Sequence, residues 1–310
     1  MSTAPLHTEI AALPAGGEAQ YVTARDGTRL RIAIWQGTRG TVLLLPGRTE
    51  YIEKYDRVIT RLVALGYAVA CIDWRGQGLS DRKVADNLGY VRRYSEFQQD
   101  MAALLGAVQG FPRPLHLIAH SMGGAIGLRA LADGALRDAG VSRAVFCAPM
   151  WGLNLPVEKR IFGPFVARFL EAFGRGQTIA PGGRASDFLR NTTLETNKLT
   201  TDRERFDWMR GHLDSHPQLT LGAPTVSWVA ASFDEMNALM DVGMPTTETL
   251  VFLGTEERVV SEGAIMTQVE RLPNSTLVKV PGARHEILQE RSQCFEPVWD
   301  RITAFLTADA

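Results

Sequence analysis

The sequence predicts an α/β domain with a mostly parallel sheet, helices on both faces and a mainly helical insertion. Three observations support this prediction. Short β-like apolar runs alternate with helical patterns as far as Pro149, the alternation then stops, and it resumes at about residue 226. The 310 residues fit one large domain carrying an insertion. We therefore expect residues 1–149 and 223–310 to form the core and residues 150–222 to form a cap or lid.

The first elements follow from turn signals and periodicity. Asp26-Gly27 separates two β-like runs, 20–24 and 28–35, and predicts a hairpin. A buried strand over 41–45 stops at Pro46-Gly47. Apolar residues at helical spacing then predict a helix over about 51–65, closed by Gly66 and followed by a buried strand over 67–72.

The later elements continue the alternation. Ser95 and Gln98 have the spacing of a capping box, which predicts a helix over about 95–109. The pattern further predicts strands over 115–119, 143–147, 249–253 and 276–280, and helices over about 122–132, 226–240, 262–271 and up to 306. Ligand sites of open α/β sheets lie at the carboxyl edge of the strands, so we expect the site there.

Composition limits the possible functions. A formal charge of −1 gives no general attraction to nucleic acid, and we expect no nucleic-acid partner. Three widely spaced cysteines, no signal-peptide pattern and no apolar run of about 18 residues predict a cytoplasmic protein. We expect at most weak, transient contact with the inner membrane face. No cluster with metal-ligand spacing and no phosphate-binding glycine loop is present in the sequence, so we expect no metal and no cofactor. The oligomeric state is left open.

The segment Leu117 to Gly124 carries the strongest functional signal. An apolar run leads to Ser121, which has small residues two positions before and after it, and a helical pattern follows. This is the arrangement of a nucleophile elbow, a tight strand-to-helix turn that raises a serine hydroxyl above the sheet edge. The alternative is an ordinary serine N-cap. We predict that Ser121 is the nucleophile of a hydrolase.

A serine nucleophile needs a base and an acid, which follow it along the chain in this type of fold. His285 lies in a glycine-containing loop directly after the last predicted strand and is the expected base. The preceding strand is followed by Glu256 and Glu257 and by no aspartate. We favour Glu257, which directly precedes Arg-Val-Val, and keep Glu256 as its rival.

An oxyanion hole needs two backbone N–H groups. Met122 follows the nucleophile at the start of a helix and is the first expected donor. The second donor should come from the loop Pro46-Gly47-Arg48, and Arg48 is our choice because proline has no N–H.

Six segments together resemble one superfamily. They are 45–55 (LPGRTEYIEKY), 73–80 (DWRGQGLS), 120–124 (HSMGG), 199–206 (LTTDRERF), 222–228 (GAPTVSW) and 282–288 (GARHEIL). They are similar to the α/β-hydrolases, in particular to the lysophospholipase and monoacylglycerol lipase branch and its bacterial lysophospholipase-like group. The resemblance implies the α/β-hydrolase fold, with Ser121 as nucleophile and His285 as base. Most relatives have His-Gly where this chain has Pro46-Gly47, and aspartate as the acid.

The insertion contains one amphipathic stretch. Phe162, Phe165 and Phe169 share a helical face with Val166, Leu170 and Phe173. One interpretation is a cap helix that packs this face on the core. The other is that these residues line an acyl-chain tunnel or touch a membrane. Arg48 is a candidate for binding a phosphate headgroup, unless Glu50 and Glu53 hold it in place.

Taken together, the sequence predicts a serine hydrolase that cleaves the ester of a lysophospholipid or a monoacylglycerol through an acyl-enzyme. Two alternatives use the same machinery: a general carboxylesterase or thioesterase, and a peptidase with carboxylates in its cap for a substrate amine. A third is a non-catalytic relative that binds a hydrophobic ligand.

Overall fold

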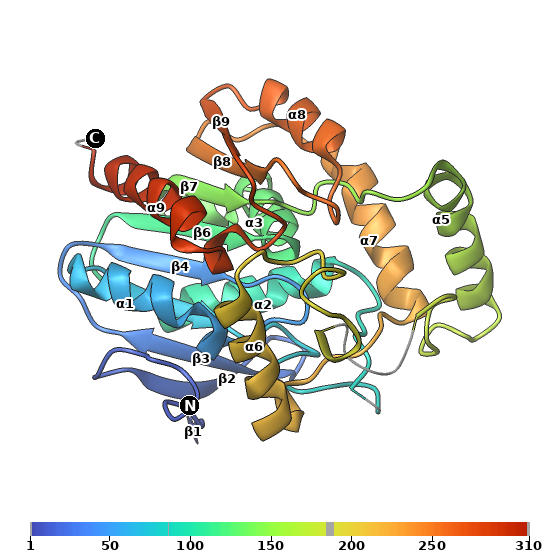
Figure 1. The fold of residues 1–310 in the computed structure, drawn as a ribbon, viewed down its shortest axis with the longest axis horizontal. Helices are drawn as coiled ribbons and strands as arrows, with labels where there is room; N and C mark the ends of the chain where they lie inside the picture. The colour runs from blue at the N-terminus through green and yellow to red at the C-terminus, as the bar shows by residue number, and fades with distance from the viewer. Residues whose placement is uncertain (1, 86, 184–188, 309–310) are drawn as a thin grey trace.

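The computed structural model describes residues 2–85, 87–183 and 189–308, and in that part of the chain the strands form one nine-stranded sheet (Figure 1). Their order across the sheet is β1-β2-β3-β5-β4-β6-β7-β8-β9. The strands are β1 (Ser2–Thr3), β2 (Glu18–Thr23), β3 (Arg29–Trp35), β4 (Thr41–Leu45), β5 (Ala68–Ile72), β6 (Leu115–His120), β7 (Val141–Cys147), β8 (Glu248–Gly254) and β9 (Ser275–Val280).

The sheet is parallel from β5 to β9 and antiparallel at its β1–β3 end. The predicted hairpin is confirmed. β2 pairs antiparallel with β3, and Gly27 has φ 86°, a left-handed conformation that glycine adopts without a steric penalty. The carboxyl ends of the parallel strands therefore lie along one edge.

Helices cover both faces, as predicted. In Figure 1, α1 and α9 lie on the near face of the sheet, and α2 and α3 lie on the far face. The helices of the core are α1 (Asp56–Ala64), α2 (Ser95–Ala107), α3 (Met122–Ala132), α4 (Ala135–Asp138), α7 (Val226–Leu239), α8 (Glu262–Arg271) and α9 (Ser292–Thr307). Short 3-10 turns, η1 (Ile52–Tyr55) and η4 (Ile287–Gln289), precede α1 and α9.

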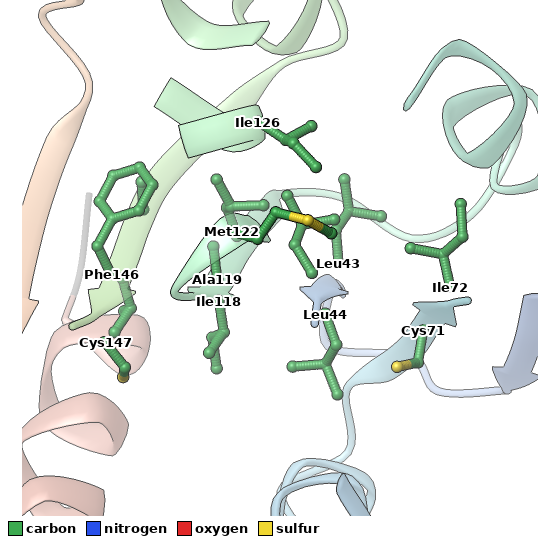
Figure 2. Close-up of a cluster of buried hydrophobic side chains, with 14 of the residues drawn as sticks. Leu43, Leu44, Cys71, Ile72, Ile118, Ala119, Met122, Ile126, Phe146 and Cys147 are labelled. Carbon is green, nitrogen blue, oxygen red and sulfur yellow. The ribbon is translucent and has the colours of Figure 1, made fainter. Parts of the chain in front are cut away.

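The central strands are buried on both faces. Figure 2 shows Leu43, Ile72 and Phe146 on one side of the sheet and their chain neighbours Leu44, Cys71 and Cys147 on the other. All six side chains are fully buried. This two-residue alternation with apolar residues on both faces is expected when helices cover both sides of parallel strands. The core gives the strand ends a rigid support.

One local prediction is wrong. Ser95 and Gln98 do not form a capping box, because α2 begins with Tyr94 at its N-cap and has no side-chain cap hydrogen bond. The carboxylate of Glu96 accepts instead from the backbone N–H groups of Arg92 and Arg93, at 3.1 Å each. The Gln98 side chain donates to the Ile126 carbonyl and so joins α2 to α3.

The inserted region divides into two parts on either side of residues 184–188. The α5 segment (residues 150–183) contains α5 (Val157–Ala172), and the α6 segment (residues 189–222) contains α6 (Arg203–Ser215) between η2 (Leu189–Asn191) and η3 (Pro217–Leu219). As predicted, the described part of the region is mainly helical. Figure 1 shows α5 at the outer edge of the molecule beside α7, whereas α6 lies near the N-terminus and α1. The boundaries of a cap at residues 150 and 222 stay a prediction.

Candidate active site

Four loops meet at the carboxyl edge of the sheet. They follow β4, β6, β8 and β9, and they carry Arg48, Ser121, Glu257 and His285 respectively. The edge is the one at which open α/β sheets place their ligands. The structure therefore collects the residues that the sequence predicted to act together.

Ser121 occupies a strained turn between β6 and α3. Its φ of 47° and ψ of −115° are rare for a residue with a side chain, and such strain is found where surrounding structure fixes it. The Ser121 N–H donates to the Cys147 carbonyl at 3.1 Å, and the Ser121 carbonyl accepts from Met150 at 2.8 Å. A Cβ at Gly123 would lie 2.2 Å from the Leu45 carbonyl oxygen. The glycine two positions after the serine is therefore required by the packing of α3 on β4.

Ser121, His285 and Glu257 form a continuous hydrogen-bonded chain. The Ser121 Oγ lies 2.9 Å from His285 Nε2, and His285 Nδ1 lies 2.8 Å from Glu257 Oε2. Ser121 and His285 are buried, and the Glu257 side chain is 3% exposed. This geometry lets the imidazole accept a proton from the hydroxyl while the carboxylate holds the other ring nitrogen.

The loop after β8 holds Glu257 as an anion. Burial alone would raise the pKa of this carboxyl, but His285 and the hydrogen bonds from the Val259 and Val260 N–H groups outweigh burial and hold the pKa below its ordinary value. Glu256 points elsewhere: its side chain is 46% exposed and lies 4.0 Å from Arg284 Nε. Of the two rivals, the structure brings Glu257 to His285.

The α6 segment holds the His285 loop, a feature that sequence reasoning missed. The His285 N–H donates to the Lys198 carbonyl at 3.4 Å, and the Glu286 N–H donates to the Leu199 carbonyl at 2.8 Å. One nitrogen of Arg284 reaches three further carbonyls of this segment, those of Leu194, Asn197 and Thr200. The resemblance of residues 199–206 to lysophospholipases was the one signal that could have pointed here.

The loop after β4 is fixed at both peptide groups that flank Gly47. The Gly47 N–H donates to the Glu50 carboxylate, and the Gly47 carbonyl accepts from Gln77 at 2.7 Å. Trp74 donates to the Pro46 carbonyl at 2.8 Å. The Gly47 N–H is therefore engaged by Glu50. Oxyanion donation by Arg48 and Met122 stays a prediction.

A cluster of buried charges lies beneath this loop. Lys54 Nζ is 2.8 Å from Glu50 Oε1 and 2.6 Å from Glu286 Oε1. Burial opposes the charge of Glu50, but Lys54, His120 and Tyr55 outweigh it and lower the pKa of Glu50 to about 2. Removing one partner of such a group typically costs about 3–5 kcal/mol. The network fixes the Gly47 loop and the residue next to His285 to each other.

His120 directly precedes the nucleophile and packs beside His285. Its ring centroid is 4.8 Å from that of His285, and its Nδ1 is 3.0 Å from the Cys147 carbonyl. Burial lowers the pKa of His120 to about 4, so the ring is neutral at pH 7. A neutral ring beside His285 adds no charge that would oppose proton uptake there.

The Arg48 guanidinium binds the end of the inserted region. It donates to the Gly222 carbonyl at 2.5 Å and lies 5.1 Å from the Trp228 ring centroid. The alternative that Glu50 and Glu53 hold Arg48 is wrong, because Glu50 binds Lys54 and Glu53 binds Arg31. The predicted phosphate contact of Arg48 is not tested by these contacts.

The aromatic face of α5 points outward. Phe162, Phe165 and Phe169 are 62%, 71% and 62% exposed. The interpretation that this face packs on the core is therefore wrong. α5 instead packs through Ala167 and Leu170 against α7, because the small Ala167 allows the two helices to approach closely. The tunnel interpretation has no support from these exposed side chains, whereas contact with a surface outside the molecule fits their exposure.

Four further charged or histidine side chains, which could be mistaken for parts of the active site, make hydrogen bonds or ion pairs elsewhere. Asp73 pairs with Arg31 at 2.7 Å, and Arg75 pairs with Asp100 at 2.6 Å. His212 lies 3.0 Å from the Tyr51 hydroxyl, and His216 lies 2.9 Å from Glu9. The two histidines thus face the N-terminal part of the chain.

A family model for the serine aminopeptidase S33 family (Hydrolase_4) matches residues 36–292. The chain belongs to this family. Two relatives of this S33 family member are named for lysophospholipase activity. Lysophospholipase L2 of Escherichia coli strain K12 is 34% identical over 270 residues, which cover 81% of this chain and 75% of the relative. Probable lysophospholipase L2 of Haemophilus influenzae is 27% identical over 94% of this chain and 92% of its own.

Solved structures confirm the α/β-hydrolase fold of this S33 family member. A soluble variant of monoglyceride lipase from Saccharomyces cerevisiae matches with a TM-score of 0.73 at 21% identity, over 94% of this chain and 96% of that one. A monoacylglycerol lipase from Paleococcus ferrophilus matches with a TM-score of 0.69 at 20% identity, over 89% and 98% of the two chains. Among the described residues, none of the helices has the length and apolar character needed to cross a bilayer. Family and fold together make the chain a serine hydrolase.

Proposed function

We propose that the chain hydrolyses the carboxylic ester of single-acyl lipids, lysophospholipids or monoacylglycerols, through an acyl-enzyme on Ser121. The observation that carries the proposal is the hydrogen-bonded chain from Ser121 through His285 to Glu257, with distances of 2.9 and 2.8 Å. The names of the lysophospholipase relatives support the choice of substrate class. The cation near the edge of the site, Arg48, is the candidate contact for a phosphate headgroup.

The reaction proceeds in two halves. Ser121 Oγ attacks the ester carbonyl while His285 Nε2 takes its proton, and the tetrahedral intermediate collapses as His285 returns that proton to the departing alcohol. Water then gives one proton to His285 Nε2 and attacks the acyl carbon, and the second tetrahedral intermediate collapses as His285 returns that proton to Ser121 Oγ and the fatty acid leaves. Glu257 holds His285 Nδ1–H and stabilises the imidazolium in both halves. His285 is neutral at the end of each half, and Ser121 regains its hydroxyl at the end of the second.

Backbone groups stabilise the negative charge that develops on the carbonyl oxygen. The Met122 N–H lies at the first turn of α3, where the helix dipole favours an anion. The Arg48 N–H belongs to the peptide group whose Gly47 carbonyl accepts from Gln77, and Trp74 and Glu50 hold the preceding peptide group. Donors of this kind are typically worth about 10²–10³ in turnover.

The α5 segment serves as a contact for a lipid surface. Seven large apolar side chains on α5 and its C-terminal end are exposed: Val157, Ile161, Phe162, Phe165, Val166, Phe169 and Phe173. Lys159, Arg160 and Arg175 lie on or next to the same helix. An apolar face flanked by cations suits an interfacial helix. One such helix gives reversible attachment, which suits an enzyme that takes its substrate from a membrane.

A matched substrate panel tests the proposal. Wild type and Ser121→Ala are assayed with lysophosphatidylcholine, monoacylglycerol, short and long p-nitrophenyl esters and an aminoacyl p-nitroanilide. We expect wild type to prefer the long single-chain lipids and Ser121→Ala to be inactive. Preference for short esters would identify a general esterase, cleavage of the anilide a peptidase, and no cleavage a binding protein. Arg48→Ala should lose more activity on the lysophospholipid than on monoacylglycerol; equal losses would exclude headgroup recognition by Arg48.

A further inference from the structure

The N-terminal segment over residues 4–14 is held against α6. The Ile10 carbonyl lies 2.6 Å from His212 Nε2 and accepts from Trp208 Nε1 at 3.0 Å. On the other side, the His7 N–H donates to the Glu53 carboxylate at 3.1 Å. These contacts bring residues 7–10 to the C-terminal end of α6. Residues that are about 200 positions apart in the sequence thus share one surface.

Three potential metal ligands converge at this place. His7 Nδ1 lies 3.0 Å from Glu9 Oε1, and His216 Nε2 lies 2.9 Å from the same oxygen. One ligand atom from each of the three residues lies within 4.8 Å of the other two. The two imidazole rings are 4.2 Å apart between centroids. The sequence did not reveal this cluster, because His216 is far from His7 and Glu9 along the chain.

The two nitrogens of His216 have different neighbours. Nε2 lies 2.9 Å from the Glu9 carboxylate, and Nδ1 lies 3.0 Å from the Ser215 hydroxyl, which also reaches the Gly211 carbonyl at 2.8 Å. With its proton on Nδ1, donated to the Ser215 oxygen, His216 turns the lone pair of Nε2 toward Glu9, which is the form that binds a metal ion.

We propose that His7 Nδ1, Glu9 Oε1 and His216 Nε2 bind a divalent transition metal ion of the Zn²⁺ class. Two imidazoles and one carboxylate are a typical zinc donor set, and the Ser215 contact supplies the outer hydrogen bond that ligating histidines make. Neighbouring ligands of a tetrahedral zinc lie about 3.3 Å apart, so the two contacts with Glu9, at 3.0 and 2.9 Å, need to widen by only a few tenths of an ångström. The two imidazole nitrogens lie within 4.8 Å of each other and need to come closer by no more than about 1.5 Å.

Solvent can reach the proposed site. The side chains of His7 and His216 are 17% and 16% exposed, and that of Glu9 is 58% exposed. Water can therefore complete the coordination. The site uses none of the residues of the Ser121–His285–Glu257 chain. Its role is structural: the metal fastens the N-terminal segment to the end of α6, the part of the chain that follows the segment holding the His285 loop.

Metal binding to tag-free, chelator-treated full-length protein tests the proposal. Titration calorimetry with Zn²⁺ at pH 7.5 should show one equivalent bound, with affinity in the micromolar range or tighter. Co²⁺ should give the visible absorption of a tetrahedral site. At a Zn²⁺ concentration 100-fold above Kd, Tm should rise by about 5 °C.

Matched variants identify the ligands. Glu9→Gln and His216→Ala should each weaken Zn²⁺ binding at least tenfold, whereas Glu18→Gln, which changes an exposed glutamate outside the cluster, should leave it unchanged. Circular dichroism confirms that each variant is folded before titration. Absence of saturable binding, binding that survives both ligand substitutions, or stabilisation that follows pH and not Zn²⁺ would each overturn the proposal. The last outcome would mean that the cation between His216 and Glu9 is a proton.

Discussion

The two halves of the inserted region differ in what they bury. α5 buries one side chain, Ala167, and leaves a row of large apolar residues in solvent. α6 buries Phe206, Met209 and Leu213 in a cluster with Tyr51 of the core, and its Asp202 side chain caps the helix. The α6 segment also contacts the His285 loop through main-chain hydrogen bonds. The inserted region, which the sequence predicted to be one cap, thus consists of two segments that differ in their burial and in their contacts with the His285 loop.

The difference has a physical basis. Burial of apolar area stabilises a helix at about 25 cal/mol per Å², so α6 gains from its contacts with the core, whereas α5 leaves most of its apolar area in water. A large exposed apolar face on a protein commonly marks a surface that contacts another protein, a ligand or a membrane. The α6 segment therefore supports the active site, and the α5 segment presents an exposed apolar surface, which we propose contacts lipid.

The largest expected effect is on the hydrogen-bonded residues Ser121, His285 and Glu257, whose histidine loop the α6 segment supports. Glu257→Gln should lower kcat by about 10³–10⁴, because the amide cannot stabilise an imidazolium at His285. Glu256→Gln is the matched control and should leave kcat within about twofold, since that side chain is exposed. Steady-state kinetics on one p-nitrophenyl ester measure both. An equal loss in the two variants would refute the choice of Glu257.

A smaller loss is expected where the α6 segment grips the His285 loop. Arg284→Met removes the hydrogen bonds to the Leu194, Asn197 and Thr200 carbonyls, and kcat should fall about 10- to 100-fold because a loosened base is misplaced. The matched change in the α5 segment, Arg168→Met, breaks an exposed pair with Asp234 and should leave kcat unchanged. KM for a short ester should hold in both. An equal loss of kcat in the two variants would contradict the proposal that only the α6 segment supports the active site.

Acid should weaken the packing of α6 through His212. In unfolded chains histidine takes up a proton near pH 6.5, whereas burial lowers the pKa of His212 on α6 to about 4. The unfolded state thus binds more protons between these values, and stability falls as the pH falls from about 6.5 to about 4, by about 3 kcal/mol for this group. Urea unfolding of His212→Gln should show a correspondingly flatter pH dependence than wild type. Parallel curves for the two proteins would contradict the assignment.

The smallest effect is expected on the outer face of α5. Changing Phe162, Phe165 and Phe169 together to Ser should alter the free energy of unfolding by no more than about 0.5 kcal/mol and leave kcat for a soluble ester unchanged, since these side chains are exposed. Co-sedimentation with vesicles containing anionic lipid should fall severalfold. A marked loss of stability would show that this face is packed, and unchanged sedimentation would remove its role at a lipid surface.

Local pattern was sufficient to predict the parallel sheet, its flanking helices and the carboxyl-edge site. Strands that are apolar throughout, glycines at Gly27 and Gly66, and the elbow around Ser121 are signals carried by a few consecutive residues. The expected order of serine, acid and histidine then led to Glu257 and His285. The structure places His285 within hydrogen-bond distance of both Ser121 and Glu257.

The rest depends on contacts between distant segments, which periodicity does not encode. The amphipathic pattern of α5 is the same for a face turned to the core and for one turned to solvent, and only the position of α7 decides between them. Lys198 and Leu199 bind the His285 loop through their backbone carbonyls, and a residue of any type could make these hydrogen bonds. The Ser95 capping box did not form because the helix begins one residue earlier, with Tyr94 at its N-cap, and the Gln98 side chain donates to the Ile126 carbonyl of α3.

The hydrogen bonds from the His285 loop to Lys198 and Leu199 limit how substrate preference can be exchanged between members of this family. Transplanting residues 157–183 from a homologue would leave in place the contacts of Met150 with Ser121 and of Asn154 with Val259, and with them the native setting of the proton-transfer residues. Transplanting residues 189–222 would import a foreign scaffold for the general base, and a chimaera of that kind would lose turnover before it gained a new specificity. We therefore expect a chimaera to keep its activity when the exchange ends between the α5 and α6 segments. We expect it to lose activity when residues 189–222 are exchanged as well.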